Sequence, residues 1–264
     1  MSEAMTSVSP FRVFMAIFMR DVTVVRREII SFLVRTTLQP ILFCVVFGYL
    51  LPMMGIIPKG FTTMMIPGLV ALSLTLSAVQ SVSLPMIADF GYTKEIEDRL
   101  LAPIPIPLVA IEKIVSGIVQ GFIAAAFVLP CARLIIGPIP GLTFSNIPLL
   151  ILITILGGTA FSAMGLLLGT GLPPQQIGLM FSIIIAPMMM FGCIYYPWRG
   201  LDRVPVLKYL VLLNPIVYAS EGMRAAITPT VTHMPVWAII AALIVTSVLF
   251  LYFGLRSFMK RAIS

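Results

Sequence analysis

Residues 61–87 read FTTMMIPGLVALSLTLSAVQSVSLPMI and contain no charged side chain. A helix of about 20 apolar residues is long enough to cross the hydrocarbon core of a bilayer. The stretch is followed at residues 88–103 by ADFGYTKEIEDRLLAP, where charged side chains gather between Asp89 and Arg99. This pattern predicts a membrane-spanning helix that ends in a short polar segment outside the membrane.

The composition extends this interpretation to the whole chain. Hydrophobic residues make up 59% of the 264 residues and charged residues only 10%, and the mean hydropathy is +1.09. A soluble domain carries about 25% charged residues, so these residues could not cover a water-exposed surface. We therefore expect one all-α integral membrane domain over residues 1–264, with no separate soluble domain.

Six apolar stretches predict six transmembrane helices, at about residues 31–51, 61–87, 109–136, 147–168, 177–195 and 236–254. Residues 10–28 alternate apolar and charged side chains, which is typical of an amphipathic helix in the membrane interface. Its basic residues Arg20, Arg26 and Arg27 would face anionic headgroups. Residues 196–232 carry repeated prolines, and we expect short re-entrant helices there, enclosed by protein before the sixth span.

The basic residues predict the orientation, because cytoplasmic loops carry an excess of Lys and Arg. With both chain ends inside, the cytoplasmic side receives Arg12, Arg20, Arg26, Arg27, Arg35, Lys94, Arg99, Lys113, Arg256, Lys260 and Arg261, out of 17 Lys and Arg residues. We expect a multi-pass protein of a bacterial inner or plasma membrane with both termini in the cytoplasm. The net charge of +7 then follows from topology, and no nucleic-acid partner is expected.

The residues offer little chemistry to the chain alone. It contains no Gly-x-x-x-x-Gly-Lys-Ser/Thr phosphate loop, and His233 is its one histidine, so a His-Glu-x-x-His metal site is excluded. Cys44, Cys131 and Cys193 are too widely spaced for a disulfide framework or a zinc site. The spans hold almost no ionisable groups near their centres, which carriers driven by protons or ions usually need. We predict no catalytic residue, metal or cofactor in this chain, and any transport must draw its energy from another protein.

Two groups of residues resemble a known family. The first comprises GYTKE (residues 91–95), RLLAP (residues 99–103) and Lys113; the second comprises FGCIYYP (residues 191–197), LNP (residues 213–215), Tyr218 and EGMR (residues 221–224). In this order and spacing they resemble the type-2 ABC exporter permeases, nearest to the daunorubicin-type drug exporters and nodulation-factor lipooligosaccharide exporters. Two departures are Tyr92, which separates a Gly-Thr pair that many members keep together, and Cys193, where glycine is common.

The resemblance implies a partner that supplies the energy. In this family two permeases, usually identical, pair in the membrane, and two ABC ATPase subunits that bind ATP and Mg dock beneath them. The segment after the second span would be a cytoplasmic coupling helix seated in the ATPase. Its contact residues would be Gly91, Tyr92, Thr93, Lys94, Glu95, Glu97, Arg99, Leu101, Ala102 and Pro103. Apolar anchors among charges suit such an interface, and the alternative is a solvated loop.

The resemblance also implies an outer gate near residues 196–232. Its candidate residues, with those of a substrate path, are Met188, Met189, Met190, Tyr195, Tyr196, Asn214, Glu221 and Arg224. Methionines could form an adaptable apolar wall, whereas aromatic residues at this depth are more often interface anchors. Glu221 and Arg224 are three residues apart and can pair on a helix, and a structural role is favoured over gating.

We therefore predict a permease that exports an amphiphilic drug, lipid or glycolipid, is powered by a separate ATPase, and is not itself an enzyme. One alternative is a permease for a polysaccharide or teichoic-acid precursor. Another is a scaffold that uses no ATP, such as a six-span twin-arginine translocase component. An intramembrane enzyme is disfavoured because no constellation of His, Cys and acidic residues is present.

The coupling segment generates a first prediction. Replacing Glu95 and Glu97 with lysine reverses two charges of the proposed interface, and we expect weaker association with the ATPase but normal membrane insertion. A pull-down of the ATPase with the double variant measures this. Unchanged binding would contradict the docking role.

Overall fold

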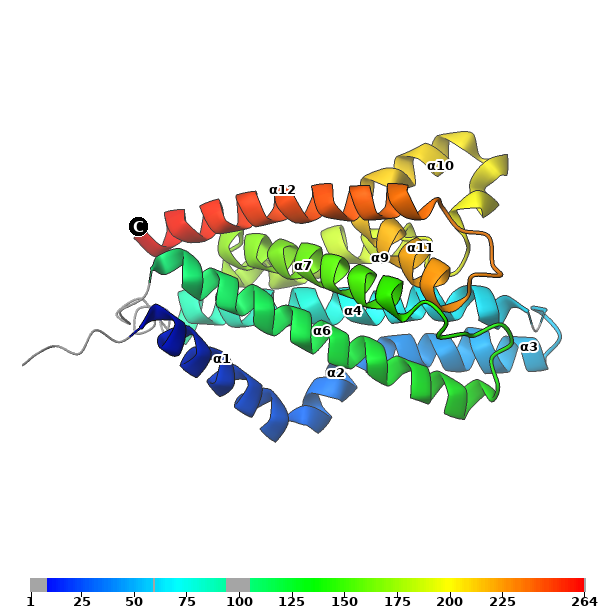
Figure 1. Cartoon of the computed structure of the whole chain (residues 1–264), viewed down its shortest axis with the longest axis horizontal. Helices are drawn as coiled ribbons and strands as arrows, with labels where there is room; N and C mark the ends of the chain where they lie inside the picture. Colours follow the sequence, from blue (N-terminus) through cyan, green and yellow to red (C-terminus); the bar gives the residue numbers. More distant parts are fainter. Residues whose placement is uncertain (1–8, 59, 94–104, 264) are drawn as a thin grey trace, which may run out of the picture.

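The computed structural model describes residues 9–58, 60–93 and 105–263. Within these ranges the chain forms helices and no strand. The long helices lie side by side along one axis, and the start of α1 (Pro10–Arg27) and the C-terminal end of α12 (Val236–Ile263) lie at the same end (Figure 1). The prediction of an all-helical membrane protein is confirmed.

Five segments of the described residues are long and apolar enough to cross a membrane. The first joins α2 (Ile29–Phe43), the π-helical η1 (Cys44–Leu50) and α3 (Leu51–Met53). The others are α4 (Phe61–Ala88) with η2 (Asp89–Thr93), α6 (Ile106–Ile136), α7 (Ile147–Gly171) and α12. The shortest has 25 residues and is therefore about 38 Å long, which exceeds a hydrocarbon core of about 30 Å.

The count of six spans is not confirmed. Where the fifth was expected, η3 (Pro174–Gln176), α8 (Ile177–Leu179), η4 (Met180–Ile185) and α9 (Ala186–Met190) form a shorter apolar helical stretch. Residues 174–190 give a helix of about 26 Å, slightly less than the hydrocarbon core. From Phe191 the chain continues without regular helix as far as Trp198, so the expected helical span over 177–195 ends early.

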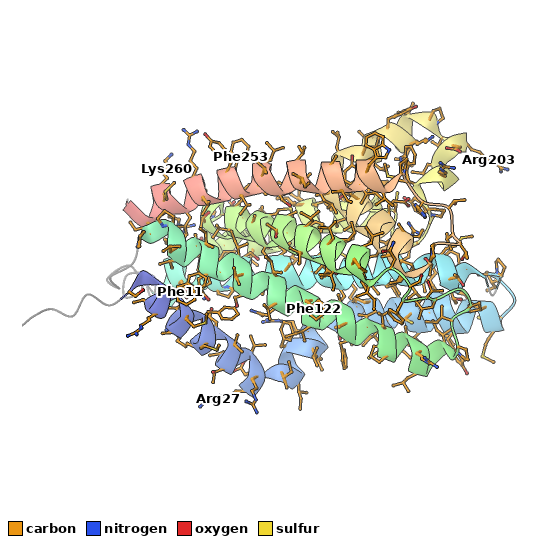
Figure 2. The ribbon with its side chains drawn as sticks, viewed as in Figure 1. Phe11, Arg27, Phe122, Arg203, Phe253 and Lys260 are labelled. Atoms are coloured by element: carbon orange, nitrogen blue, oxygen red, sulfur yellow. The ribbon has the colours of Figure 1, made fainter. Side chains whose placement is uncertain are left out.

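Short helices gather at the end of the bundle away from the C-terminus (Figure 1). They are η5 (Trp198–Arg203), α10 (Pro205–Leu210), η6 (Val211–Leu213) and α11 (Pro215–Ile227). At the other end, α1 lies outside the main bundle, with Phe11 and Arg27 directed away from it (Figure 2). The chain turns at Glu28, between α1 and α2.

The last helix is longer than expected. The sequence predicted an end near Gly254, but α12 continues to Ile263. A Cβ atom on Gly254 would lie 2.9 Å from the carbonyl oxygen of Ala163 in α7. This glycine therefore allows two helices to approach closely and does not terminate one.

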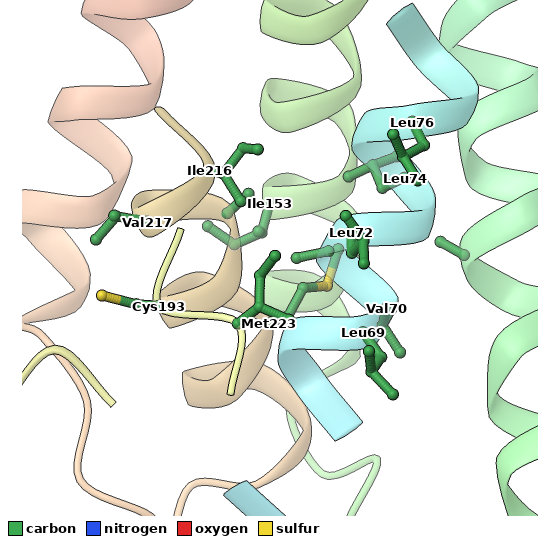
Figure 3. Close-up of a cluster of buried hydrophobic side chains, with 14 of the residues drawn as sticks. Leu69, Val70, Leu72, Leu74, Leu76, Ile153, Cys193, Ile216, Val217 and Met223 are labelled. Carbon is green, nitrogen blue, oxygen red and sulfur yellow. The ribbon is translucent and has the colours of Figure 1, made fainter. Parts of the chain in front are cut away.

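The central helix is α4. In its most apolar stretch of 18 residues, 89% of the residues are buried by the rest of the chain. Its side chains Leu69, Leu72 and Leu74 pack with Ile153 of α7 and Met223 of α11 in the main apolar cluster (Figure 3). By contrast, only 22% of the residues in the corresponding stretch of α12 are buried. Its outward face carries exposed apolar residues such as Trp237 and Val248, as lipid contact requires.

Glycines let α7 approach the backbone of α4. Gly165 and Gly169 form a Gly-x-x-x-Gly pair, a pattern that allows close helix packing in membranes. A Cβ atom on Gly165 would lie 2.7 Å from the carbonyl oxygen of Val79, and one on Gly169 would lie 2.9 Å from Cα of Ser83. Because the obstructing atoms belong to the backbone, they cannot move without separating the two helices.

This packing predicts that Gly165→Ala destabilises the protein by about 1–3 kcal/mol, because overpacking outweighs the better helix propensity of alanine. The melting temperature in detergent should fall by about 2–10 °C. Gly171→Ala is the matched control at the end of the same helix, where a Cβ atom meets nothing within 4 Å. Equal melting temperatures for the two variants would contradict the close packing.

Candidate functional site

A fully buried ion pair lies at the centre of the candidate outer site. Glu221 and Arg224 are both 0% exposed, and Nη1 of Arg224 lies 2.6 Å from Oε1 of Glu221. They stand one turn apart on α11, which packs against α4, α7 and α12. Buried charges are tolerated only with close partners, and this pair supplies them mutually.

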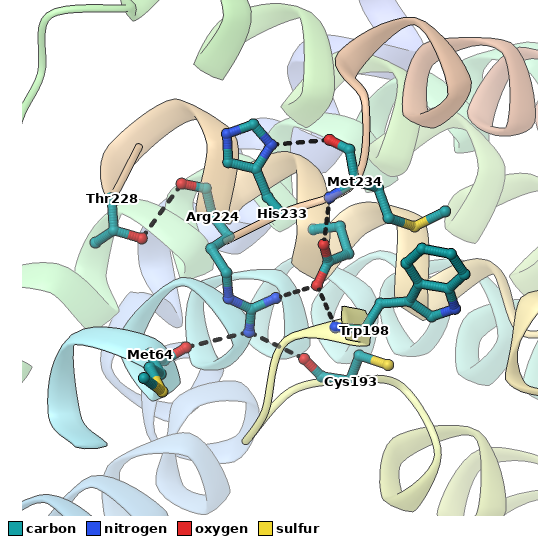
Figure 4. Close-up of polar contacts among 8 residues, drawn as sticks. Met64, Cys193, Trp198, Arg224, Thr228, His233 and Met234 are labelled. Atoms are coloured by element: carbon teal, nitrogen blue, oxygen red, sulfur yellow. Dashed lines mark hydrogen bonds and ion pairs between the residues drawn. The ribbon is translucent and has the colours of Figure 1, made fainter. Parts of the chain in front are cut away.

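The pair also forms hydrogen bonds to backbone groups of three other segments: the start of α4, residues 193–198 and the loop before α12 (Figure 4). Nη2 of Arg224 donates to the carbonyl oxygens of Met64 and Cys193, each at 3.1 Å. Oε1 of Glu221 accepts from the backbone N–H of Trp198 at 2.9 Å, and Oε2 accepts from that of Met234 at 2.7 Å. The geometry is that of a structural ion pair, and a gating role for it stays a prediction.

The segment after α9 passes directly over α4. Cys193 has a φ of +51°, in the left-handed region that favours glycine. A Cβ atom on Gly68 of α4 would overlap the carbonyl oxygen of Ile194. Cys193 therefore holds a backbone conformation that glycine would adopt with less strain.

Asn214 joins α9 to the start of α11. Its Oδ1 accepts from the backbone N–H of Ile216 at 3.1 Å and so caps the helix, while its Nδ2 donates to the carbonyl oxygen of Met188 at 2.6 Å. Pro215 occupies the first turn, where a missing N–H does no harm. The Asn-Pro motif thus sets where α11 begins.

The three consecutive methionines of α9 face different surroundings. Met188 lines an apolar cavity of about 470 Å³ between α7, α9, α12 and the segment from α10 to α11. Met189 is buried, and its sulfur lies 4.0 Å from Nε2 of Gln39 in α2. Met190 is 62% exposed. The structure therefore places only Met188 on this cavity.

The two predicted tyrosines, Tyr195 and Tyr196, pack between segments of the chain. The Tyr195 ring lies 5.2 Å from that of Phe43 and 5.8 Å from that of Phe47, which links residues 191–197 to the first span. Tyr196 is half-buried against the apolar core. These contacts suit structural packing, and a role of either tyrosine in a substrate path stays a prediction.

The predicted coupling segment lies mostly outside the described residues. Lys94, Glu95, Glu97, Arg99, Leu101, Ala102 and Pro103 belong to that part, and their proposed role stays a prediction. Gly91 lies in η2 beside Pro174, whose ring a Cβ atom at Gly91 would overlap. The ends that flank the segment, η2 and the start of α6, lie at the same end of the bundle as the C-terminus (Figure 1).

A second polar cluster at this end was not identified as a site from the sequence. Lys113 is 4% exposed and donates from Nζ to Oδ2 of Asp21 on α1, with Oε2 of the buried Glu112 at 3.8 Å. Arg20 lines a cleft together with Asp21 and Lys113, whereas Arg26 lines a separate groove. The sequence did contain a signal for this cluster, because Glu112 and Lys113 stand together inside an apolar helix and charged residues there usually have partners.

Among the described residues, no group of three His, Cys, Asp or Glu side chains is placed to hold a metal ion. The described residues form a helical bundle that holds an apolar cavity and a buried ion pair. This defines a multi-pass membrane protein whose site geometry suits transport.

Comparison with known proteins identifies the class as a transport permease. A family model described as "ABC-2 type transporter" matches residues 12–228, so the chain belongs to the ABC-2 type transporter family. Proteins of this family are permeases that work with an ABC ATPase, and they are not themselves enzymes. The chain is 25% identical over 207 residues to "Inner membrane transport permease YadH" of Escherichia coli strain K12, covering 72% of this chain and 75% of that protein. The same figures hold for YadH of Shigella flexneri, and no solved structure matches.

The buried pair generates a prediction about stability. Arg224→Met or Glu221→Leu leaves one charge buried without its partner, and we expect a loss of about 3–5 kcal/mol in either variant. The melting temperature in detergent should fall by about 6 °C or more. Asp202→Asn is the control, because it breaks the Asp202–Lys208 bridge of 2.7 Å at an exposed carboxylate, where such bridges contribute little. Similar losses for all three variants would refute the structural role.

The conformation of Cys193 generates another prediction. Cys193→Gly should be more stable than Cys193→Ala by about 1 kcal/mol, because only glycine adopts the left-handed conformation without strain. In an ordinary buried position the order would be reversed. Thermal unfolding of both variants in the same detergent decides between these orders.

Proposed function

We propose that this chain is the permease subunit of an exporter that moves an amphiphilic, lipid-like substrate outward through the inner membrane. The observation that carries this proposal is the apolar cavity beside Met188 and Asn214, in a chain of the ABC-2 type transporter family. Two ABC ATPase subunits, docked on residues 89–103 as the coupling segment, would supply the energy. A second, identical permease copy would complete the membrane part.

The arrangement of the bundle supports the proposed orientation. The chain's C-terminal end, the start of α1 and both flanks of residues 94–104 lie at one end (Figure 1). With that end in the cytoplasm, Arg20, Lys113 and Lys260 follow the positive-inside rule and the coupling segment meets the ATPase. The relatives named YadH are inner membrane permeases, and we assign the same membrane to this chain.

The cavity lining favours an amphiphile. Its volume of about 470 Å³ falls in the range of about 300–1,000 Å³ that holds drug-sized ligands. Its walls come from Leu, Met, Ile, Val, Phe and Pro side chains, and Asn214 is the one polar residue among them. A polysaccharide or teichoic-acid precursor would need many hydrogen-bonding groups that this wall does not offer. A drug, a lipid or a glycolipid held by its acyl chains fits better, as in the drug and lipooligosaccharide exporters that the sequence resembles.

Reconstitution of the permease with its ATPase in proteoliposomes tests this proposal. We expect ATP-dependent movement of a fluorescent short-chain phospholipid, and no movement of a water-soluble fluorescent oligosaccharide. Met188→Trp should lower the phospholipid rate at least fivefold by filling the cavity. Leu134→Trp is the control, since Leu134 lies outside the cavity and is 86% exposed on α6. Equal rates for the two variants, or movement of the oligosaccharide alone, would overturn the proposal.

A further inference from the structure

A cleft of about 280 Å³ lies between the turn from α1 to α2 on one side and helices α4 and α6 on the other. Its lining carries charges of both signs. The cationic residues are Arg20, Arg35 and Lys113, and the acidic residues are Asp21, Glu28 and Asp89. The Met188 cavity is lined by no charged side chain, and the groove beside Val119 is lined by Arg26 alone among charged residues.

An apolar groove of about 310 Å³ adjoins this cleft. Val25 and Gln120 line both, so the cleft and the groove form one continuous surface. The groove is walled by apolar side chains that include Ile29, Val119 and Ile123. A charged cleft that opens into an apolar groove has the shape of a phospholipid, with a headgroup at one end and an acyl chain at the other.

The depth of the cleft agrees with a lipid headgroup. Helix α6 has 31 residues and is about 46 Å long, so it extends about 8 Å beyond each side of a core of about 30 Å. Lys113 lies about 10 Å from the start of α6 on the same scale, near the boundary between headgroups and acyl chains. A molecule with its headgroup beside Lys113 could therefore direct its chain into the bilayer along Val119 and Ile123.

The charges select among headgroups. Glu28 and Arg35 are both exposed at the cleft, where each can meet a ligand. A phosphate would interact with the guanidinium of Arg35, and an ammonium group would interact with the carboxylate of Glu28. Asp21 is already paired with Lys113, so an anionic headgroup without an ammonium would bring its negative charge against the exposed Glu28 carboxylate.

From this juxtaposition we propose that the cleft and groove bind one zwitterionic phospholipid, of the phosphatidylethanolamine class, between α1–α2 and α6. The lipid stabilises the angle between the interfacial helix and the first span. This site shares no lining residue with the Met188 cavity, and the proposal does not depend on the proposed function.

Native mass spectrometry of the full-length permease in detergent tests the site. Dioleoyl phosphatidylethanolamine and dioleoyl phosphatidylglycerol are added at equal concentrations, and the fraction of protein with one lipid bound is followed during titration. We expect the ethanolamine lipid to bind at least tenfold more tightly. Glycerophosphoethanolamine, which lacks acyl chains, should not compete, because the groove contributes to binding.

Variants distinguish the cleft from general attraction to membrane charge. Arg35→Gln with Glu28→Gln should weaken binding of the ethanolamine lipid at least tenfold, and Val119→Trp should do the same by filling the groove. Arg27→Gln is the matched control, because Arg27 lies next to Glu28 in the chain but lines neither the cleft nor the groove. Equal binding of both lipids, or unchanged binding by the cleft and groove variants, would overturn the proposal.

Discussion

Backbone groups outside regular helices are a difficulty for any membrane protein, because lipid offers them no hydrogen bonds. In this chain the buried Glu221–Arg224 pair meets that difficulty. Its donors and acceptors bind backbone groups of Met64, Cys193, Trp198 and Met234. The start of α4, the segment from Cys193 to Trp198 and the loop before α12 therefore depend on one ion pair. Within the network, both carboxylate oxygens of Glu221 and both terminal nitrogens of Arg224 have partners, whereas the buried Nε of Arg224 has none among the described residues.

Close packing against α4 also shields the backbone outside regular helices from lipid. Gly68 lets the backbone at Ile194 lie against α4, and Gly165 lets α7 do so from another side. Irregular backbone at residues 191–197 is thus covered by helix backbone and reached by Arg224. This close packing contrasts with the cavity beside Met188, whose long apolar side chains can adapt to a ligand.

Much of the fold follows from the sequence because apolar runs of sufficient length have few alternatives to a spanning helix. Residues 61–87 and 147–168 illustrate this, since α4 and α7 cover them. Ends were harder to predict. Gly254 was expected to end a helix but serves close packing with Ala163, a contact between distant parts of the chain. The stretch at 177–195 ends early for a similar reason, because the segment after α9 packs on α4.

Parts of the candidate site could be predicted where residues close together in the sequence form a recognisable pattern. The spacing of Glu221 and Arg224 predicted a pair on one helix turn, but their backbone partners come from three distant segments and leave no local pattern. The same holds for the three methionines, which look equivalent in the sequence and face three different surroundings. Asp21 and Lys113 are 92 residues apart in the chain, and only the folded arrangement brings them together.

A separate ATPase supplies the energy for transport in the proposed function, and ATP hydrolysis by the purified complex is the measurement that tests this dependence. The permease is purified with a tag from cells that express the ABC ATPase of its own operon or genome neighbourhood. We expect that an ATPase subunit copurifies with the permease and that the complex hydrolyses ATP in a reaction that vanadate inhibits. A permease that is folded in detergent but retains no ATPase subunit, and shows no vanadate-sensitive hydrolysis when one is added, would contradict it.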